Sequence, residues 1–260
     1  MLVRASTSCI LSVFAIAALS LTGGADQKVP LLNNPISSWI SFKSVPLSEA
    51  LSTLGQHVED GFVLFGLEVK LEDGKEPTVT LEGQPGMKLG DAITQVLKQL
   101  PDYEMEVVSD HLINLRPSGA KQNPENILNL RVGKFDAVSM RATMILNTPW
   151  DVIPELNEAL IPKGKPGEAP IFLIHRGYQG GSPITLHLKD VMVREILNAA
   201  SKATEPFYEM GEPGKAPSGW VYTFDPHLPK GYSQHAWRRH FGLPLGWRAV
   251  RDSKKNSKDK

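Results

Sequence analysis

The first half of the chain alternates short apolar runs with two amphipathic segments that have helical periodicity. The first apolar stripe follows Pro46, ends at Gly61, and consists of Leu47, Ala50, Leu51, Leu54 and Val58. The second ends at Pro101 and consists of Leu89, Ala92, Ile93, Val96, Leu97 and Leu100. Each stripe predicts a helix with one apolar face, so each helix needs a second layer to cover it.

Strands are predicted around these two helices. Tyr103, Met105 and Val107 alternate with two glutamates, a pattern typical of a half-buried strand. The order strand, helix, strand, strand, helix, strand, strand predicts an α+β fold in which two helices cover a small mixed sheet. The expected strands cover residues 40–45, 62–71 with a break at Gly66, 78–81, 103–107 and 113–115.

The second half of the chain partly repeats this plan. Residues 184–188 match 79–81 in alternation, and a stripe of Val193, Ile196, Leu197 and Ala200 matches the second helix. A strand over 128–132 and a helix opening at Thr148-Pro149 are expected upstream. Strands at 207–210 and 220–224 close the repeat. We therefore expect two related α+β units, each a small mixed sheet covered by two helices.

These patterns divide the chain into segments. Pro117 to Pro124 has the composition of a linker, and the first folded unit starts near Trp39. Whether the two units pack on each other is not decided by the pattern. The expected order is a signal peptide over 1–25, a lead over 26–38, a first unit over 39–116, a linker over 117–126, a second unit over 127–226, and a C-terminal tail over 227–260.

The first unit resembles a known family. Phe42 to Leu54 reads Phe-Lys-Ser-Val-Pro-Leu-Ser-Glu-Ala-Leu-Ser-Thr-Leu, and Leu81-Glu82-Gly83 precedes Met87-Lys88-Leu89-Gly90-Asp91-Ala92-Ile93. This is similar to the secretin and TonB short N-terminal (STN) domain, with its two helices of Leu-x-x-Ala-Leu type. The resemblance covers about residues 39–116, with a weaker second copy near 184–224. It implies a small periplasmic interaction module. The chain carries no secretin or barrel region after it, so pore formation and transport are not expected.

The N-terminus is typical of a secretory signal. Arg4 precedes an apolar run of about a dozen residues from Ile10 to Leu21, which is shorter than the about 20 residues that a membrane-spanning helix needs. Small residues up to Ala25 then provide a cleavage site. An uncleaved membrane anchor is the alternative. We expect an exported protein, periplasmic or extracellular, with no transmembrane segment once the signal is removed.

Cysteine content and charge add two constraints. The single cysteine, Cys9, lies inside the predicted signal, so the mature chain has no disulfide and depends on a buried core. The chain balances 28 basic against 28 acidic residues, but residues 225–260 hold nine Lys or Arg against three Asp, and residues 26–224 hold 18 against 25. An acidic body with a basic tail favours anionic partners for the tail.

Catalytic and cofactor motifs are absent from the sequence. It has no Gly-x-Ser-x-Gly, His-Glu-x-x-His or phosphate-binding loop, and we expect no catalytic residues and no cofactor. His227, His235 and His240 are the best metal candidates, although they lack the short spacing of common zinc sites. In the tail, aromatic and basic residues alternate and could hold an anionic polymer or lipid surface. These tentative binding residues are Trp237, Arg238, Arg239, Trp247 and Arg248. Packing of the tail aromatics on the acidic body is the structural alternative.

The main functional hypothesis is a non-enzymatic envelope protein that binds a protein partner through STN-like units. Small mixed sheets expose edge strands to which a partner can add a strand. A hydrolase or metal-dependent enzyme centred on the C-terminal histidines is one alternative. A binder of anionic envelope glycan or lipid through the basic tail is another. Export makes nucleic acid an unexpected target.

Overall fold

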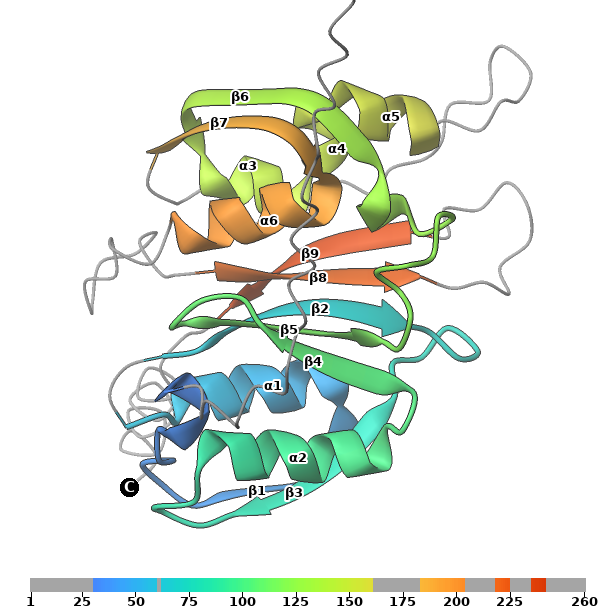
Figure 1. Ribbon diagram of the computed structural model, residues 1–260. Helices are drawn as coiled ribbons and strands as arrows, with labels where there is room; N and C mark the ends of the chain where they lie inside the picture. The colour runs from blue at the N-terminus through green and yellow to red at the C-terminus, as the bar shows by residue number, and fades with distance from the viewer. Residues whose placement is uncertain (1–29, 60–61, 161–182, 204–217, 225–234, 242–260) are drawn as a thin grey trace, which may run out of the picture.

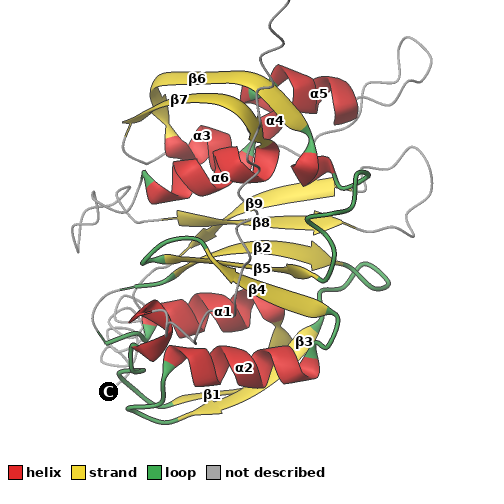
Figure 2. Cartoon of the chain, viewed as in Figure 1, coloured by secondary structure: helices red, strands yellow, loops and turns green. Residues whose placement is uncertain are grey.

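The computed structural model describes residues 30–59, 62–160, 183–203, 218–224 and 235–241, and for the last of these ranges only the path of the backbone. The protein is α+β, as predicted. Its layers follow one another in a stack: a two-stranded ribbon, two helices, a central five-stranded sheet, further helices and a second two-stranded ribbon (Figures 1 and 2).

The first half of the chain supplies the lower layers in Figure 1. Its two longer helices are those predicted from the apolar stripes, and Ile93 of the second is fully buried. The described elements are η1 (Pro30–Asn33), β1 (Ile40–Pro46), α1 (Leu47–Gln56), β2 (Leu64–Lys70), β3 (Thr78–Gly83), α2 (Leu89–Gln99), β4 (Tyr103–Val107) and β5 (Leu112–Pro117).

The second half supplies the upper layers. The helix predicted from the apolar stripe of Val193, Ile196, Leu197 and Ala200 is present, and all four side chains are buried. The described elements are η2 (Ile127–Asn129), β6 (Arg131–Arg141), α3 (Ala142–Asn147), α4 (Pro149–Val152), α5 (Pro154–Leu160), β7 (Pro183–Met192), α6 (Val193–Lys202), β8 (Ser218–Phe224) and β9 (His235–Phe241).

Both halves contribute to the central sheet. Its strand order is β4-β5-β2-β8-β9, in which β2 runs parallel to β5 on one side and to β8 on the other. β4 and β9 are the two outer strands, and each runs antiparallel to its neighbour. The two halves of the chain are therefore joined by backbone hydrogen bonds between β2 and β8, in addition to side-chain packing.

The two faces of this sheet differ because alternate side chains point to opposite sides. One face packs on α1 and α2 and carries Leu67, Val69, Ile113 and Leu115, which belong to the first hydrophobic core. The opposite face turns toward the second half, where Trp220 and Tyr222 belong to the second hydrophobic core. This second face also carries buried polar side chains, namely Glu68, Asn114 and Arg116.

The internal repeat is visible in the two ribbons. β1 pairs with β3 and β6 pairs with β7, each antiparallel and each with one register shift. At the shift, Ser44 and Ser139 have the same positive φ of 52°. The backbone N–H of Ser44 donates to Oγ1 of Thr80 (3.1 Å), and that of Ser139 donates to Oγ1 of Thr185 (3.2 Å). The predicted match of residues 184–188 to 79–81 thus extends to a common β-bulge.

Some local predictions were wrong. β2 runs unbroken through Gly66. This glycine accommodates close neighbours, since a Cβ there would lie 2.2 Å from Oδ1 of Asn114 and 2.6 Å from the ring of Trp220. The described part of the lead, residues 30–38, belongs to the first core, since Leu31 and Ile36 are buried. The second ribbon begins at Arg131, after the short helical turn η2.

The helix predicted from Thr148 is divided in two. α4 starts at Pro149, as predicted, but it ends at Val152, and α5 begins anew at Pro154. Pro154 lacks a backbone N–H and its ring opposes the preceding turn, so a single continuous helix is disfavoured. The sequence pattern also missed α3, a six-residue helix directly before α4.

Candidate functional site

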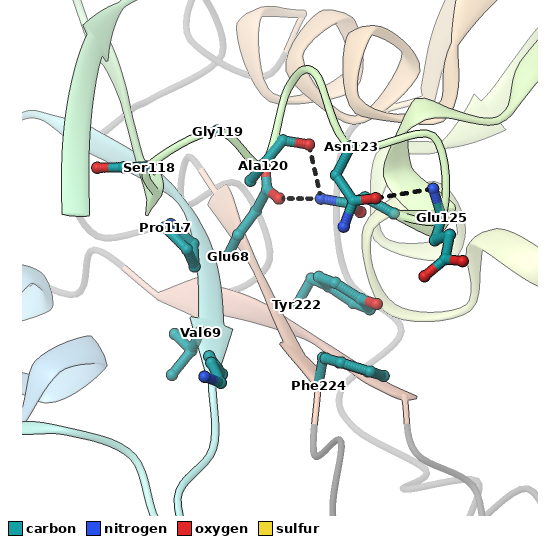
Figure 3. A pocket seen from close by; sticks show the side chains of 12 residues that line it. Glu68, Val69, Pro117, Ser118, Gly119, Ala120, Asn123, Glu125, Tyr222 and Phe224 are labelled. Atoms are coloured by element: carbon teal, nitrogen blue, oxygen red, sulfur yellow. Dashed lines mark hydrogen bonds between the residues drawn. The ribbon is translucent and has the colours of Figure 1, made fainter. Parts of the chain in front are cut away.

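A cavity of about 490 Å³ opens where the two halves meet (Figure 3). Its walls come from the ends of β2 and β8 and from the loop between β5 and η2, which is the segment predicted to be a linker. The lining residues are Glu68, Val69, Lys70, Pro117, Ser118, Gly119, Ala120, Asn123, Glu125, Asn126, Tyr222 and Phe224. The volume lies in the range of about 300–1,000 Å³ that is typical of small-molecule sites.

Two asparagines fix the shape of the loop wall. Nδ2 of Asn126 donates to the carbonyl of Ala120 (3.2 Å), and Nδ2 of Asn129 donates to the same carbonyl (2.8 Å) and to that of Asn123 (2.6 Å). Oδ1 of Asn123 accepts from the N–H of Glu125 (3.0 Å). The linker composition therefore builds a loop that is held by side-chain hydrogen bonds.

Glu68, which lines the cavity, belongs to a buried ion pair. Nε of Arg194 on α6 donates to Oε1 of Glu68 on β2 over 2.6 Å, and both side chains are less than 5% exposed, at 3% and 4%. Oε2 of Glu68 accepts from Nδ2 of Asn126 (2.8 Å), and Nη1 of Arg194 donates to Oδ1 of Asn129 (2.5 Å). Both carboxylate oxygens of Glu68 are thus occupied, so this charge is compensated within the protein.

Two aromatic side chains of β8 form the wall opposite the loop. Figure 3 shows Tyr222 and Phe224 projecting in the same direction from the strand, below Asn123 and Glu125. Tyr222 is buried and Phe224 is half-buried. Burial raises the pKa of Tyr222 above its ordinary value, and the negative charge of Glu68 adds to the effect. The phenol therefore stays neutral at physiological pH.

The cavity rim carries one charge of each sign. Lys70 and Glu125 are both exposed and line the opening. Together with the compensated Glu68, they leave the cavity without a marked net charge. The arrangement offers an apolar aromatic wall on one side and hydrogen-bonding groups on the other, which suits a ligand that is itself apolar on one face and polar on another.

A second, smaller cavity of about 280 Å³ lies between α6 and the end of β4. It is lined by Glu106, Val108, Lys121, Met192, Arg194, Glu195, Asn198, Ala199 and Lys202. Its acidic residues already have partners: Glu106 binds Arg116 (2.5 Å) and Lys121 (3.0 Å). Burial alone would raise the pKa of Glu106, but the hydrogen bonds from these two cations outweigh it and lower the pKa.

The junction between α6 and the sheet is incompletely hydrogen-bonded. Trp220 donates from Nε1 to Oδ1 of Asn198 (2.9 Å). Among the residues that the structure describes, the side-chain amide of Asn114 and Nη2 of Arg194 are buried without a hydrogen-bond partner. Such groups each cost about 1–3 kcal/mol, so this polar layer is less strongly stabilised than the two apolar cores.

The outer strand β4 presents a backbone edge. The N–H of Val108 donates to the carbonyl of Leu112 (2.9 Å), and that of Ser118 donates to the carbonyl of Asp102 (2.6 Å). In an antiparallel pair, every second residue directs its backbone N–H and C=O groups toward the partner strand. Given these two bonds and the register, Glu104 and Glu106 are the β4 residues whose backbones bond to β5. Met105 and Val107 then direct their N–H and C=O groups away from β5, and no described strand lies on that side.

The predicted tail residues divide into two groups. Trp237, Arg238 and Arg239 lie on β9, where the backbones of Tyr222, Val221 and Trp220 are their respective partners. Trp247 and Arg248 lie outside the described residues. Part of the segment predicted as a tail is therefore an outer strand of the central sheet. Binding of an anionic polymer by these residues stays a prediction.

The predicted metal candidates are divided in the same way. His235 and His240 lie five residues apart on β9, which separates their backbones by about 16 Å, and His227 lies outside the described residues. Within the described part of the chain, no group of three or more His, Cys, Asp or Glu side chains is placed to hold a metal ion. The metal hypothesis gains no support from the two placed backbones.

The sequence analysis missed a contact between Ser38 and His57. Oγ of Ser38 and Nδ1 of His57 lie 2.5 Å apart, and Oγ of Ser37 donates to the carbonyl of His57 (3.0 Å). Burial lowers the pKa of His57. The serines precede β1 and His57 follows α1, so these bonds fasten the lead segment to the end of the helix. Ser38 and His57 are 19 residues apart in the sequence, and no sequence pattern indicates their contact.

The likeness to known proteins was tested at three levels. No family model matches the chain, no curated protein matches it in sequence, and no solved structure matches its fold. Among the described residues, no helix is both long and apolar enough to cross a membrane.

Proposed function

We propose that the chain is an exported, non-enzymatic interaction module of the cell envelope, periplasmic or extracellular, with one STN-like domain and a second, degenerate copy. It binds a protein partner that adds an extended strand to β4. The observation that carries this proposal is the backbone edge of Met105 and Val107 on an outer strand of the central sheet, which no other strand among the described residues pairs with.

β4 lacks the features that proteins commonly use to block an edge strand. It contains no proline and no lysine, and its register with β5 has no bulge. Its two glutamates are held by Arg116, whose Nε binds Glu104 (2.8 Å). Their charge is therefore directed into the sheet face and does not protect the edge against an added strand.

The half-buried state of β4 supports the same proposal. All five of its residues are intermediate in exposure, and Tyr103, Met105 and Val107 pack at the margin of the first core. An added strand would bury the remaining apolar surface and supply main-chain hydrogen bonds, which is the mode of partner recognition known as strand addition.

A proline substitution tests strand addition directly. Met105→Pro removes the outward N–H without removing a bond to β5, and Met105→Ala is the matched control for the lost side chain. We expect wild type and Met105→Ala to retain the same envelope protein on an affinity column, and Met105→Pro to lose it. In the purified complex, amide exchange should slow at Met105 and Val107. Equal retention by all three proteins would refute strand addition at β4.

Export has its own test. The exported form should begin at or near Asp26, which N-terminal sequencing of the protein from the periplasmic or secreted fraction would show. A chain that retains Met1 and remains in the cytosolic fraction would remove the envelope from the proposal.

A further inference from the structure

The larger cavity has two chemically different walls. Tyr222 and Phe224 form an aromatic surface on β8, and across from them the loop presents Asn123 and Glu125 (Figure 3). A ligand that fills this space must pack an apolar face against the rings while it exchanges hydrogen bonds with the loop. A purely apolar ligand would leave the loop groups unsatisfied, which is costly in a partly enclosed site.

Pyranose rings have this two-sided character. The axial C–H bonds of a β-linked hexose form an apolar face that stacks on aromatic rings, while its hydroxyl groups lie around the rim. Serine hydroxyls, asparagine amides and carboxylates donate to or accept from such hydroxyls. We propose that this cavity binds a neutral saccharide, with one ring stacked on Phe224 and its hydroxyls bonded to the loop of residues 117–126.

The charges of the cavity favour a neutral ligand over an ionic one. The charge of Glu68 is compensated by Arg194, and its second carboxylate oxygen accepts from Asn126, so this carboxylate does not require a cation from the cavity. Lys70 and Glu125, at the rim, oppose each other in sign. An anionic ligand would meet Glu125 and a cationic ligand would meet Lys70, whereas a hydroxylated neutral ring can bond to both.

This inference goes beyond the proposed function and does not depend on it, because the cavity is lined by β2, β8 and the loop, and by no residue of β4. The two are distinguishable by variants. Met105→Pro should leave saccharide binding unchanged, and changes in the cavity should leave strand addition at β4 unchanged.

The probes are cellotetraose and chitotetraose, two neutral β-linked oligosaccharides, titrated at millimolar concentration into the full-length mature protein and followed by NMR. We expect one of them to shift the resonances of the loop 117–126 and of Tyr222 and Phe224. Phe224→Leu keeps an apolar side chain but removes the stacking ring, and it should weaken binding about tenfold. Asn123→Ala, at an exposed position, should weaken binding without disturbing either core.

Two matched variants serve as controls. Glu125→Gln keeps the hydrogen-bonding shape and removes the charge, so it should leave the affinity nearly unchanged. Loss of saccharide binding in this variant would show that the charge of Glu125 is essential to binding, and it would overturn the proposed recognition by stacking and uncharged hydrogen bonds. Trp39→Ala removes an aromatic ring that is 76% exposed and does not line the cavity, so it should bind like wild type. Absence of shifts with both probes, or full affinity in both Phe224→Leu and Asn123→Ala, would also overturn it.

Discussion

Arg194 of α6 donates to Glu68 of β2 across 2.6 Å, although the two residues are 126 positions apart in the chain. The pair joins the two halves at the polar face of the central sheet, where Glu68 lines the larger cavity and Arg194 lines the smaller one. Because a buried charge without a partner is expensive, this contact fixes how α6 sits on the sheet. It also explains why both residues are almost fully enclosed.

Breaking the pair from one side should destabilise the protein strongly. Arg194→Ala leaves the Glu68 carboxylate buried without its cation, which costs about 3–5 kcal/mol in the free energy of unfolding. Urea denaturation followed by circular dichroism measures this difference. The double variant Glu68→Leu with Arg194→Met replaces the charges by apolar groups of similar size and should recover most of the loss. A single-variant loss below about 0.5 kcal/mol, typical of surface positions, would contradict the buried pair.

Gly66 should not tolerate a side chain. A methyl group there meets Oδ1 of Asn114 and the ring of Trp220 well inside contact distance. Gly66→Ala should therefore lower the free energy of unfolding by about 1–3 kcal/mol. Gly133→Ala is the matched control, because a methyl group at that strand position meets open space. Thermal melting of the two variants side by side checks the prediction, and equal melting temperatures would refute it.

The two bulges should respond alike to loss of their threonine hydroxyls. Thr80→Val removes the acceptor for the N–H of Ser44, and Thr185→Val removes the acceptor for Ser139. Both bonds are exposed, so water replaces part of each, and we expect a loss of about 0.5–1 kcal/mol in either variant. Chemical denaturation of both proteins provides the comparison. A clear loss in one bulge and none in the other would argue against their structural equivalence.

The apolar cores were predictable because their signal is local. The stripes at 47–58, 89–100 and 193–200 specify which face of each helix is buried, and these faces are buried as expected. Pro149 is the first residue of α4, as predicted, since proline suits that position. Pro46 was predicted at the first position of its helix but lies one residue earlier, as the last residue of β1, and α1 begins at Leu47.

The junction could not be predicted because it depends on pairings between distant segments. No local pattern shows that β8 would pair with β2, and Gly66 resembled a strand break until its neighbour Trp220 was known. The loop of the cavity has the composition of a linker, and only the hydrogen bonds of Asn126 and Asn129 make it a wall. Glu68 and Arg194 have no sequence signature at all.

His57 should make stability depend on pH in the mildly acidic range. Burial lowers its pKa below the ordinary value of 6.5, so between the folded and unfolded pKa values the unfolded chain binds more protons. The stabilising contribution of neutral His57 to the folded state is complete above about pH 6.5. It is lost as the pH falls from the unfolded pKa through the lower folded pKa. We expect the free energies of unfolding of wild type and His57→Gln, measured by denaturation across this pH range, to become more similar as the pH falls. A constant difference at every pH would contradict the prediction.

The basic C-terminal segment has three interpretations: it binds an anionic surface, it holds a metal ion, or it serves only to complete the sheet. Variants of residues on β9 distinguish them. Arg238 and Arg239 lie on an outer strand of the sheet, and charged residues are common on such edges. We expect Arg238→Glu with Arg239→Glu to reduce retention on anionic envelope glycan or lipid vesicles while the melting temperature changes little. Added salt should weaken the wild-type retention, since exposed charges are screened over about 8–10 Å near physiological ionic strength.

A bound metal would give a different pattern, in which His235→Ala and His240→Ala lower the metal content and the arginine changes do not. A fall in melting temperature with unchanged retention would show that the arginines serve only to hold β9 in the sheet.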